Sequence, residues 1–182
     1  MSGKNTAVFG IFTTATHAER GVDALVVANF PSSDVSVLLP DTPGTRDFAH
    51  EKDTKAPEGT AAGVTAGGAI GGTLGVLVGV GALAIPGLGP FIAAGPIMAG
   101  LAGLGVGGAV GGLVGALVGM GMPEYEAKRY EGRVKSGGVL LSVHCATAED
   151  VKRAKSILKT CGAEDIASAG ESAGRERVAA RA

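Results

Sequence analysis

The side chains best suited to chemistry in this sequence are two cysteines and three histidines, and two of them are neighbours, His144 and Cys145. An imidazole beside a thiol activates a nucleophilic cysteine when the two groups lie within hydrogen-bonding reach. These residues end an apolar run, residues 139–143, that predicts a β-strand. Because successive side chains of a strand point to opposite faces, we expect the two to diverge. The sequence therefore predicts no catalytic residue here.

The histidines also lack the spacing of a metal site. His17, His50 and His144 are far apart along the chain, and Cys145 and Cys161 form no Cys-x-x-Cys pair. Matches to Gly-x-Gly-x-x-Gly arise easily in a chain with 32 glycines, and no Gly-Lys-Ser/Thr triplet occurs. We expect no resident metal, no cofactor and no enzymatic activity.

The overall charge excludes one further class of function. The 182 residues hold 16 Lys and Arg against 17 Asp and Glu, a formal net charge of -1, so nothing draws the chain toward nucleic acid. Two cysteines without a disulfide pattern are typical of a reduced, cytoplasmic protein. Glycine is over-represented, because 32 of the 182 residues are glycine, whereas its average share in proteins is about 7%.

The N-terminal flank predicts a strand, a helix and a second strand. Val8–Phe12 is β-branched and aromatic, and the apolar run Val35–Leu38 stops at a turn that begins with Pro40. Between these runs, Thr14 and two neighbouring threonines are favoured N-cap residues for a helix over His17–Asn29.

The C-terminal flank repeats this order. Residues 139–143 predict a strand, Thr147 and Asp150 form a variant capping box, and Gly162 has the position of a C-cap glycine. Residues 165–168 are a weak strand pattern in the corresponding place. Two β-α-β halves predict an α+β domain with a ferredoxin-like sheet of four strands and two helices on one face.

The segment between these halves predicts a glycine-rich apolar α-helical hairpin that interrupts the domain. Residues 59–122 contain no charged residue and hold 22 of the 32 glycines, and residues 62–81 and 102–121 are identical at 12 of 20 positions. Glycine at every fourth residue leaves a groove along a helix that admits another backbone. The ten glycines of the two ladders are Gly63, Gly67, Gly71, Gly75, Gly79, Gly103, Gly107, Gly111, Gly115 and Gly119.

The hairpin divides the chain into five parts. We expect a first β-α-β half over residues 1–40, a polar linker over 41–58, the hairpin over 59–122, a second half over 123–170 and a flexible tail over 171–182. The second half opens with a short charged connector helix, in which Pro123 suits the first helical position. Its Tyr125 and Tyr130 suit either a membrane-interface belt or a cap on the domain.

Length and flanking charge favour a lipid environment for the hairpin. A helix over Ala62–Ile85 would be about 36 Å long, against roughly 30 Å of bilayer core. Its tip has no polar side chain and contains Pro86, Gly87, Gly89 and Pro90, whereas basic residues flank its base, namely Lys52, Lys55, Lys128, Arg129 and Arg133. This pattern favours both ends on the cytoplasmic side of the inner membrane. The alternative is a protein in the cytoplasm whose hairpins bury each other in a homo-oligomer.

Short patterns in both flanks resemble a known group of bacterial proteins. Val8-Phe-Gly-Ile-Phe, the following helix and Val35-Ser-Val-Leu-Leu resemble the opening of general-stress proteins of the heat-induced YflT type. Gly138-Val-Leu-Leu-Ser-Val-His and Gly162-Ala-Glu-Asp-Ile resemble the closing half of glycine-zipper and low-temperature-induced relatives. The resemblance implies a stress-associated bacterial protein and supplies no catalytic residue.

The sequence therefore predicts a non-enzymatic, stress-associated protein that is membrane-associated or self-assembling. In this interpretation the glycine-rich hairpin anchors and oligomerises the protein, and the α+β domain faces the cytoplasm. Two alternatives remain open. One is a soluble oligomeric protein that responds to a small molecule or a metal, and the other is an accessory subunit of a membrane redox complex.

Overall fold

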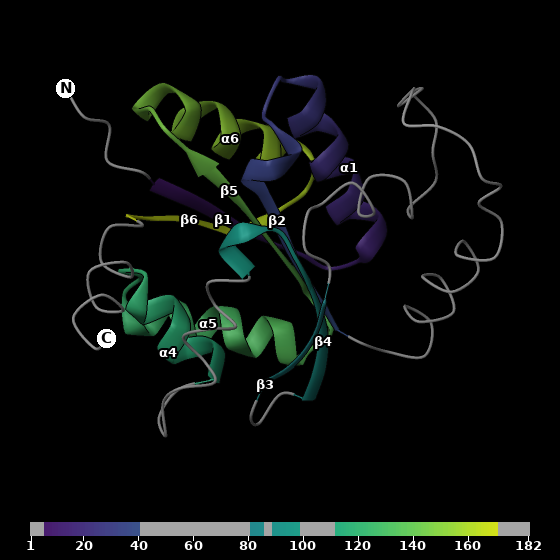
Figure 1. Cartoon of the computed structure of the whole chain (residues 1–182), viewed down its shortest axis with the longest axis vertical. Helices are drawn as coiled ribbons and strands as arrows, with labels where there is room; N and C mark the ends of the chain where they lie inside the picture. The colour runs from purple at the N-terminus through teal and green to yellow at the C-terminus, as the bar shows by residue number, and fades with distance from the viewer. Residues whose placement is uncertain (1–5, 41–80, 86–88, 99–111, 171–182) are drawn as a thin grey trace, which may run out of the picture.

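The computed structural model describes residues 6–40, 81–85, 89–98 and 112–170 (Figure 1). The described elements, in chain order, are β1 (Thr6–Phe12), α1 (Ala15–Val27), the 3-10 turn η1 (Ser32–Asp34), β2 (Val35–Pro40), β3 (Gly81–Ile85), β4 (Gly89–Ala94), α4 (Gly112–Gly119), α5 (Glu124–Lys135), β5 (Val139–Cys145), α6 (Ala148–Thr160) and β6 (Glu164–Gly170).

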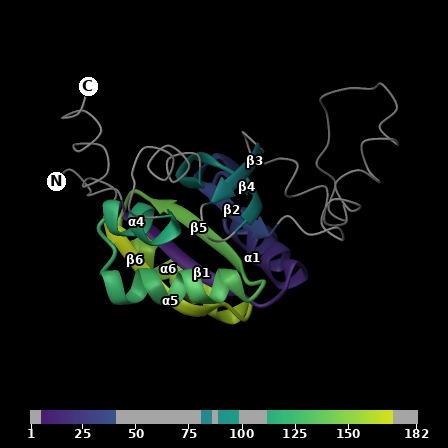
Figure 2. The ribbon, with the colours of Figure 1, turned by 90° about the horizontal axis from the view of Figure 1, so that it is seen from below.

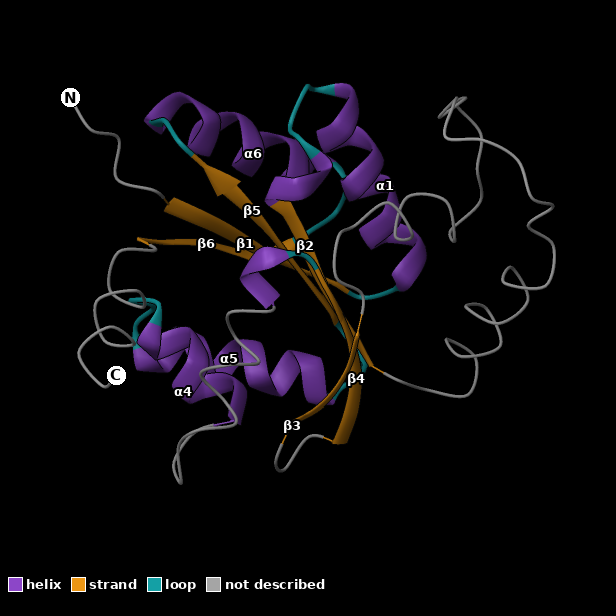
Figure 3. Ribbon diagram, in the orientation of Figure 1, coloured by secondary structure: helices purple, strands orange, loops and turns teal. Residues whose placement is uncertain are grey.

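The described strands form one antiparallel sheet of six strands in the order β3-β4-β2-β5-β1-β6 (Figure 3). The two flanks interlock in this sheet, because β5 of the second half lies between β1 and β2 of the first. β1 in turn lies between β5 and β6. The predicted α+β class is confirmed.

Helices cover both faces of the sheet. α1 and α6 pack on one face, whereas α4 and α5 pack on the other (Figures 1 and 2). Alternation along the strands separates two cores. On β1, Val8 and Phe12 face α1 and α6, while Phe9 and Ile11 face α4 and α5. The expectation of helices on one face alone was therefore wrong, because the connector helix α5 and part of the glycine-rich segment build a second layer.

The glycine-rich segment departs from the predicted helical hairpin over residues 81–94. A helix was expected to continue to Ile85, yet Gly81–Ile85 and Gly89–Ala94 are paired strands, and β4 extends the sheet from β2. β4 is apolar toward both cores, since Phe91 and Ala93 face α4 while Ala94 faces the α1 side. A strand buried on both faces shows no alternation, so its sequence resembles that of a buried helix.

The sequence signals for helix ends are confirmed at three positions. Thr14 accepts a hydrogen bond from the amide of His17, and Thr147 accepts one from the amide of Asp150. Gly162 follows α6 with a φ of 89° and donates to the carbonyl of Lys159, as a glycine after a helix end does. Pro123 is the N-cap of α5 rather than its first helical residue.

Candidate interaction site

Two of the ten ladder glycines, Gly115 and Gly119, lie within the described residues, and both belong to α4. Leu113, Ala116 and Leu117 of this helix are buried in the core between α4 and the sheet, whereas the two glycines are half-buried. This end of the second ladder is thus helical, as predicted, but it packs on the domain itself. The other eight ladder glycines lie outside the described residues.

Two of the four predicted tip residues lie in the sheet. Gly89 and Pro90 belong to β4, where Gly89 pairs with Ile85, whereas Pro86 and Gly87 lie outside the described residues. A proline has no amide proton to give to a neighbouring strand, and Pro90 comes early in β4, where strands tolerate proline. The interpretation of Gly89 and Pro90 as part of a helical tip was wrong, since both residues belong to strand β4.

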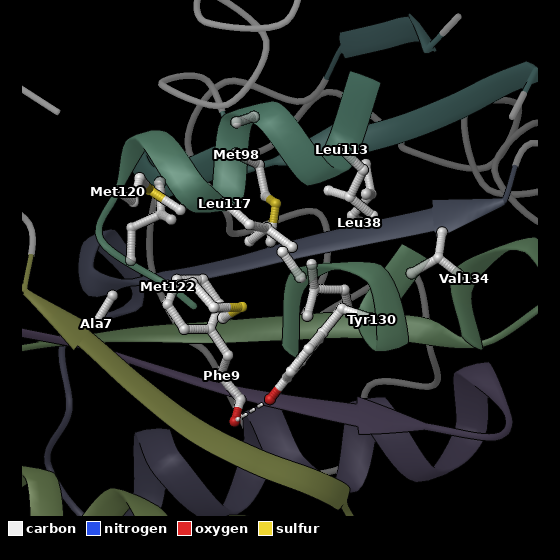
Figure 4. Close-up of a cluster of buried hydrophobic side chains, with 14 of the residues drawn as sticks. Ala7, Phe9, Leu38, Met98, Leu113, Leu117, Met120, Met122, Tyr130 and Val134 are labelled. Carbon is white, nitrogen blue, oxygen red and sulfur yellow. Dashed lines mark hydrogen bonds between the residues drawn. The ribbon is translucent and has the colours of Figure 1, made fainter. Parts of the chain in front are cut away.

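Side chains from the glycine-rich segment form much of the core under α4 and α5 (Figure 4). Every one of them is at most 8% exposed. Burial of this kind contributes roughly 1.5–3 kcal/mol for each large side chain. The interior of the domain therefore accounts for most of the apolar residues in 91–98 and 113–122. The buried residues are Phe91, Ala93, Ile97, Met98, Leu113, Ala116, Leu117, Met120 and Met122.

The chain after β4 lies directly on β2. Ile97 donates its backbone amide to the buried hydroxyl of Ser36 at 3.0 Å. Gly95 has a φ of +94°, and a Cβ there would overlap with Ser36 Oγ and with the carbonyl oxygen of Val35. Only glycine fits both the conformation and the space. This contact turns the chain from the sheet toward α4.

The predicted membrane-flanking residues of α5 form ion pairs within the domain. Lys128 pairs with Glu124 at 2.7 Å, Arg129 pairs with Asp165, and Arg133 reaches Glu164 at 2.7 Å and Asp165 at 3.2 Å. Lys52 and Lys55 lie outside the described residues. Arg129 and Arg133 thus join α5 to β6, which gives them a role within the fold that their spacing in the sequence did not reveal.

Asp165 is the centre of this α5–β6 clamp. Its φ of +51° is unusual for a residue other than glycine, although aspartate tolerates it better than most. The residue sits at a bulge, because Phe9 pairs with Ala167 while Ile11 pairs with Glu164, leaving two residues of β6 opposite Gly10. The carboxylate is 7% exposed and accepts from both arginines.

Tyr130 completes the clamp from α5. Its hydroxyl donates to the backbone carbonyl of Asp165 and lies 3.4 Å from the carbonyl oxygen of Phe9, the contact drawn in Figure 4. Its ring meets that of Phe9 edge-to-face at 6.5 Å. Burial raises the pKa of Tyr130 well above its usual value, and the backbone of Ala167 opposes this only in part. The domain-cap reading of Tyr130 agrees with this placement.

Comparison with protein-family models, with curated proteins and with solved structures finds no match to this chain. The geometry of its own residues is therefore the basis for the functional proposals.

His144 and Cys145 diverge as predicted. Cys145 lies in the core under α1 and α6, whereas His144 pairs across the sheet with Ala7, whose side chain lies on the other face. His17 lies on α1, and His50 is outside the described residues. Within the described ranges, no three His, Cys, Asp or Glu side chains gather as a metal site would require.

The second cysteine packs between the two helices of the α1 and α6 layer. Cys161 Sγ lies 3.7 Å from the carbonyl oxygen of Arg20. Burial raises the pKa of the Cys161 thiol, so the thiolate needed for nucleophilic chemistry is disfavoured.

The ion pair between Glu124 and Lys128 is exposed to solvent. Its hydrogen bond lowers the pKa of Glu124 and raises that of Lys128, and both side chains are about two-thirds exposed. Among the described helices, none has the length and apolarity needed to cross a membrane.

Proposed function

We propose that this protein is a non-enzymatic, self-assembling protein whose contact element is the first glycine ladder, residues 59–80. The burial of residues 91–98 and 113–122 in the domain carries the proposal. Most of their apolar side chains are already buried in the core of the domain. The longest charge-free stretch left for contacts with another copy precedes β3, and it contains Gly63, Gly67, Gly71, Gly75 and Gly79.

The attachment of this stretch to the sheet favours protein contacts over a membrane crossing. Pro40 of β2 and Leu83 of β3 both pair with Phe91 of β4, so the strands before and after residues 41–80 lie on either side of one strand. A single crossing would put the two ends on opposite sides of a bilayer, and two crossings need about 40 apolar residues. Contact with a lipid surface is therefore the alternative, and the experiment must distinguish it from self-assembly.

The proposal includes a ferredoxin-like plan for the flanks. The order β2-β5-β1-β6, with α1 and α6 as crossover helices on one face, supports this assignment, and β3, β4, α4 and α5 are then additions to the plan. For the compartment we propose the cytoplasm, which the sequence offered as the alternative to the cytoplasmic side of the inner membrane. We also retain the association with stress, which rests on the resemblance of the strand and helix patterns alone.

The test compares two adjacent glycines of the full-length chain. Gly71 belongs to the ladder, whereas Gly72 does not. We expect Gly71→Leu to weaken self-association by at least about tenfold in analytical ultracentrifugation, because a side chain fills the groove, while Gly72→Leu changes it far less. A wild-type chain that stays monomeric at high concentration would refute the proposal.

Two measurements distinguish self-assembly from membrane association. The first is flotation with vesicles of phosphatidylethanolamine and phosphatidylglycerol, and the second is carbonate extraction of cell membranes. Self-assembly predicts that the protein stays at the bottom of the gradient as an oligomer. A monomer that floats, and that loses flotation with Gly71→Leu but not with Gly72→Leu, would replace self-assembly by membrane association.

A further inference from the structure

β6 is an edge strand of the described sheet. Among the described strands it pairs with β1 alone, so its other side offers backbone amide and carbonyl groups to a further strand. The bulge at Asp165 interrupts the ladder at one end, and residues 167–170 pair regularly with β1. Neither proline nor charge, which commonly protect an edge strand, occurs in residues 167–170, and Ser168 and Gly170 are exposed. This edge is open to strand addition.

α6 lies over the β6 end of the sheet (Figure 1). A Cβ at Gly10 of β1 would contact Leu158 of α6 at 3.4 Å and Ile166 of β6 at 3.8 Å, so the helix packs over both strands. Its other flank meets α1, because Arg153 donates to the carbonyl oxygen of Ala28. α1 joins β1 to β2 across β5, whereas α6 joins β5 to β6 across β1. The flank of α6 that faces away from α1 therefore borders the β6 edge.

That flank carries a row of three lysines, Lys152, Lys155 and Lys159, which we call the lysine row. Their spacing places them on one face of the helix, and Lys155 lies about 160° around the helix from Arg153. Lys152 and Lys159 are exposed, and Lys155 is half-buried. No carboxylate of the described residues pairs with any of the three. A local excess of positive charge therefore borders the β6 edge, although the formal net charge of the chain is -1.

The charge of the lysine row argues against a second copy as the occupant of the edge. Antiparallel pairing of two β6 strands, with α6 of both chains on the same face, would bring two lysine rows side by side, and like charges repel. Nucleic acid and lipid headgroups match the lysines in charge but form no ladder of backbone hydrogen bonds with a strand. An extended acidic peptide satisfies both the edge and the lysines.

We propose that the β6 edge and the lysine row bind an extended acidic segment of a partner protein by strand addition. Side chains on one face of an added strand recur about every 6.6 Å, and the lysine row spans about 10.5 Å along the axis of α6. The segment thus carries acidic residues at alternate positions, which face α6. This binding does not depend on whether the protein self-associates.

Isothermal titration calorimetry tests the proposal with the full-length chain and the peptide Ser-Glu-Thr-Glu-Thr-Glu-Thr-Ser. A peptide with lysine in place of glutamate is the charge control. Two further peptides keep the charge, and one is N-methylated at its glutamates while the other is N-methylated at its threonines. Because neighbouring amides of a strand point to opposite sides, strand addition predicts that one of these two peptides loses binding and the other keeps it.

Charge reversal at the lysine row gives the matching test on the protein. We expect Lys155→Glu to weaken binding of the acidic peptide at least about tenfold, because it places a carboxylate opposite the acidic side chains. Arg20→Glu makes the same change in net charge at an exposed position of α1, and we expect it to change the affinity less than about twofold. Circular dichroism establishes that both variants are folded.

The outcomes that would overturn the proposal are distinct. One is a folded wild-type chain that does not bind the acidic peptide, and another is equal weakening by Lys155→Glu and Arg20→Glu. Equal binding of both N-methylated peptides would assign the lysines to a surface that is recognised by charge alone, such as anionic lipid. A disulfide between two copies of a chain with Ser168→Cys and Cys161→Ser would identify a second copy as the occupant instead.

Discussion

The hydroxyl of Tyr130 donates to the backbone carbonyl of Asp165, and this bond joins α5 to β6 where the pairing of β1 with β6 is interrupted. A bulge leaves backbone groups without ladder partners, and a buried group without a partner costs stability. The tyrosine thus serves the sheet as well as the core, because it supplies from a helix the donor that β1 does not provide.

Removing the hydroxyl of Tyr130 tests whether its hydrogen bond to Asp165 stabilises the fold. We expect Tyr130→Phe to lower the free energy of unfolding by about 1–3 kcal/mol, because the ring remains and only the buried donor is lost. Urea unfolding followed by circular dichroism measures the change. Tyr125→Phe on the same helix is the control, since Tyr125 is 69% exposed and should leave stability unchanged. Equal stability of both variants would show that the hydroxyl does not hold β6.

Substitutions of Asp165 separate its charge from its backbone conformation. Asn tolerates a positive φ but lacks the charge that pairs with Arg129 and Arg133, so Asp165→Asn should cost roughly 1–3 kcal/mol. Asp165→Ala should cost about 1 kcal/mol more, because alanine is strained in this conformation. Thermal unfolding ranks the two variants. The reverse order would mean that the left-handed conformation is not retained.

The contact of Gly95 with Ser36 predicts opposite effects of one substitution at two glycines. Gly95→Ala should destabilise the domain by more than about 2 kcal/mol, because its Cβ would overlap with backbone and its φ is positive. Gly132→Ala, in α5 with open space around it, should stabilise by about 0.5–1 kcal/mol. Chemical denaturation of both variants provides the measurement, and a neutral Gly95→Ala would contradict the close approach of the chain to β2.

Packing of α4 in the domain predicts a stability effect in plain buffer. Leu117 is fully buried, and Leu117→Ala should cost about 2–5 kcal/mol by creating a cavity. Val27→Ala, at a position 82% exposed, is expected to have little effect. Both variants should be compared without detergent or lipid. If Leu117→Ala were neutral in buffer and harmful only in vesicles, α4 would belong to a lipid environment.

The raised pKa of Tyr130 predicts a loss of stability at alkaline pH. Burial favours the neutral phenol in the folded state, so this contribution is complete below pH 10, the ordinary pKa in the unfolded chain, and falls as the pH rises above it. Urea unfolding between pH 8 and pH 11 should therefore show a steeper decline for the wild type than for Tyr130→Phe. Parallel declines would assign the alkaline loss to other groups.

The flanks were predictable because their signals are local. Thr14, Thr147 and Gly162 mark helix ends by residue type, and the apolar runs that became β1, β2 and β5 stand between clear breaks. Each of these signals depends on a few neighbouring residues. Strand and helix boundaries then followed to within a few positions.

The second face of the sheet was not predictable, because its determinants are distant in sequence. Ile97 bonds to Ser36 across 61 positions, and Tyr130 bonds to Asp165 across 35. No local pattern indicates either contact. β4 is apolar on both faces, so nothing in its periodicity separates it from a buried helix. We therefore propose the first ladder, rather than a symmetrical hairpin, as the interaction site.

The position of β1 has a consequence for how the chain reaches its fold during synthesis. Both neighbours of β1, β5 and β6, come from the last part of the described chain, and the ladder closes only when Thr6 meets Gly170. Contacts so distant in sequence make folding slow, and chains are made at about 5–20 residues per second. Until then Val8-Phe-Gly-Ile-Phe is an apolar strand with two open edges, the kind of segment that molecular chaperones shield on the ribosome.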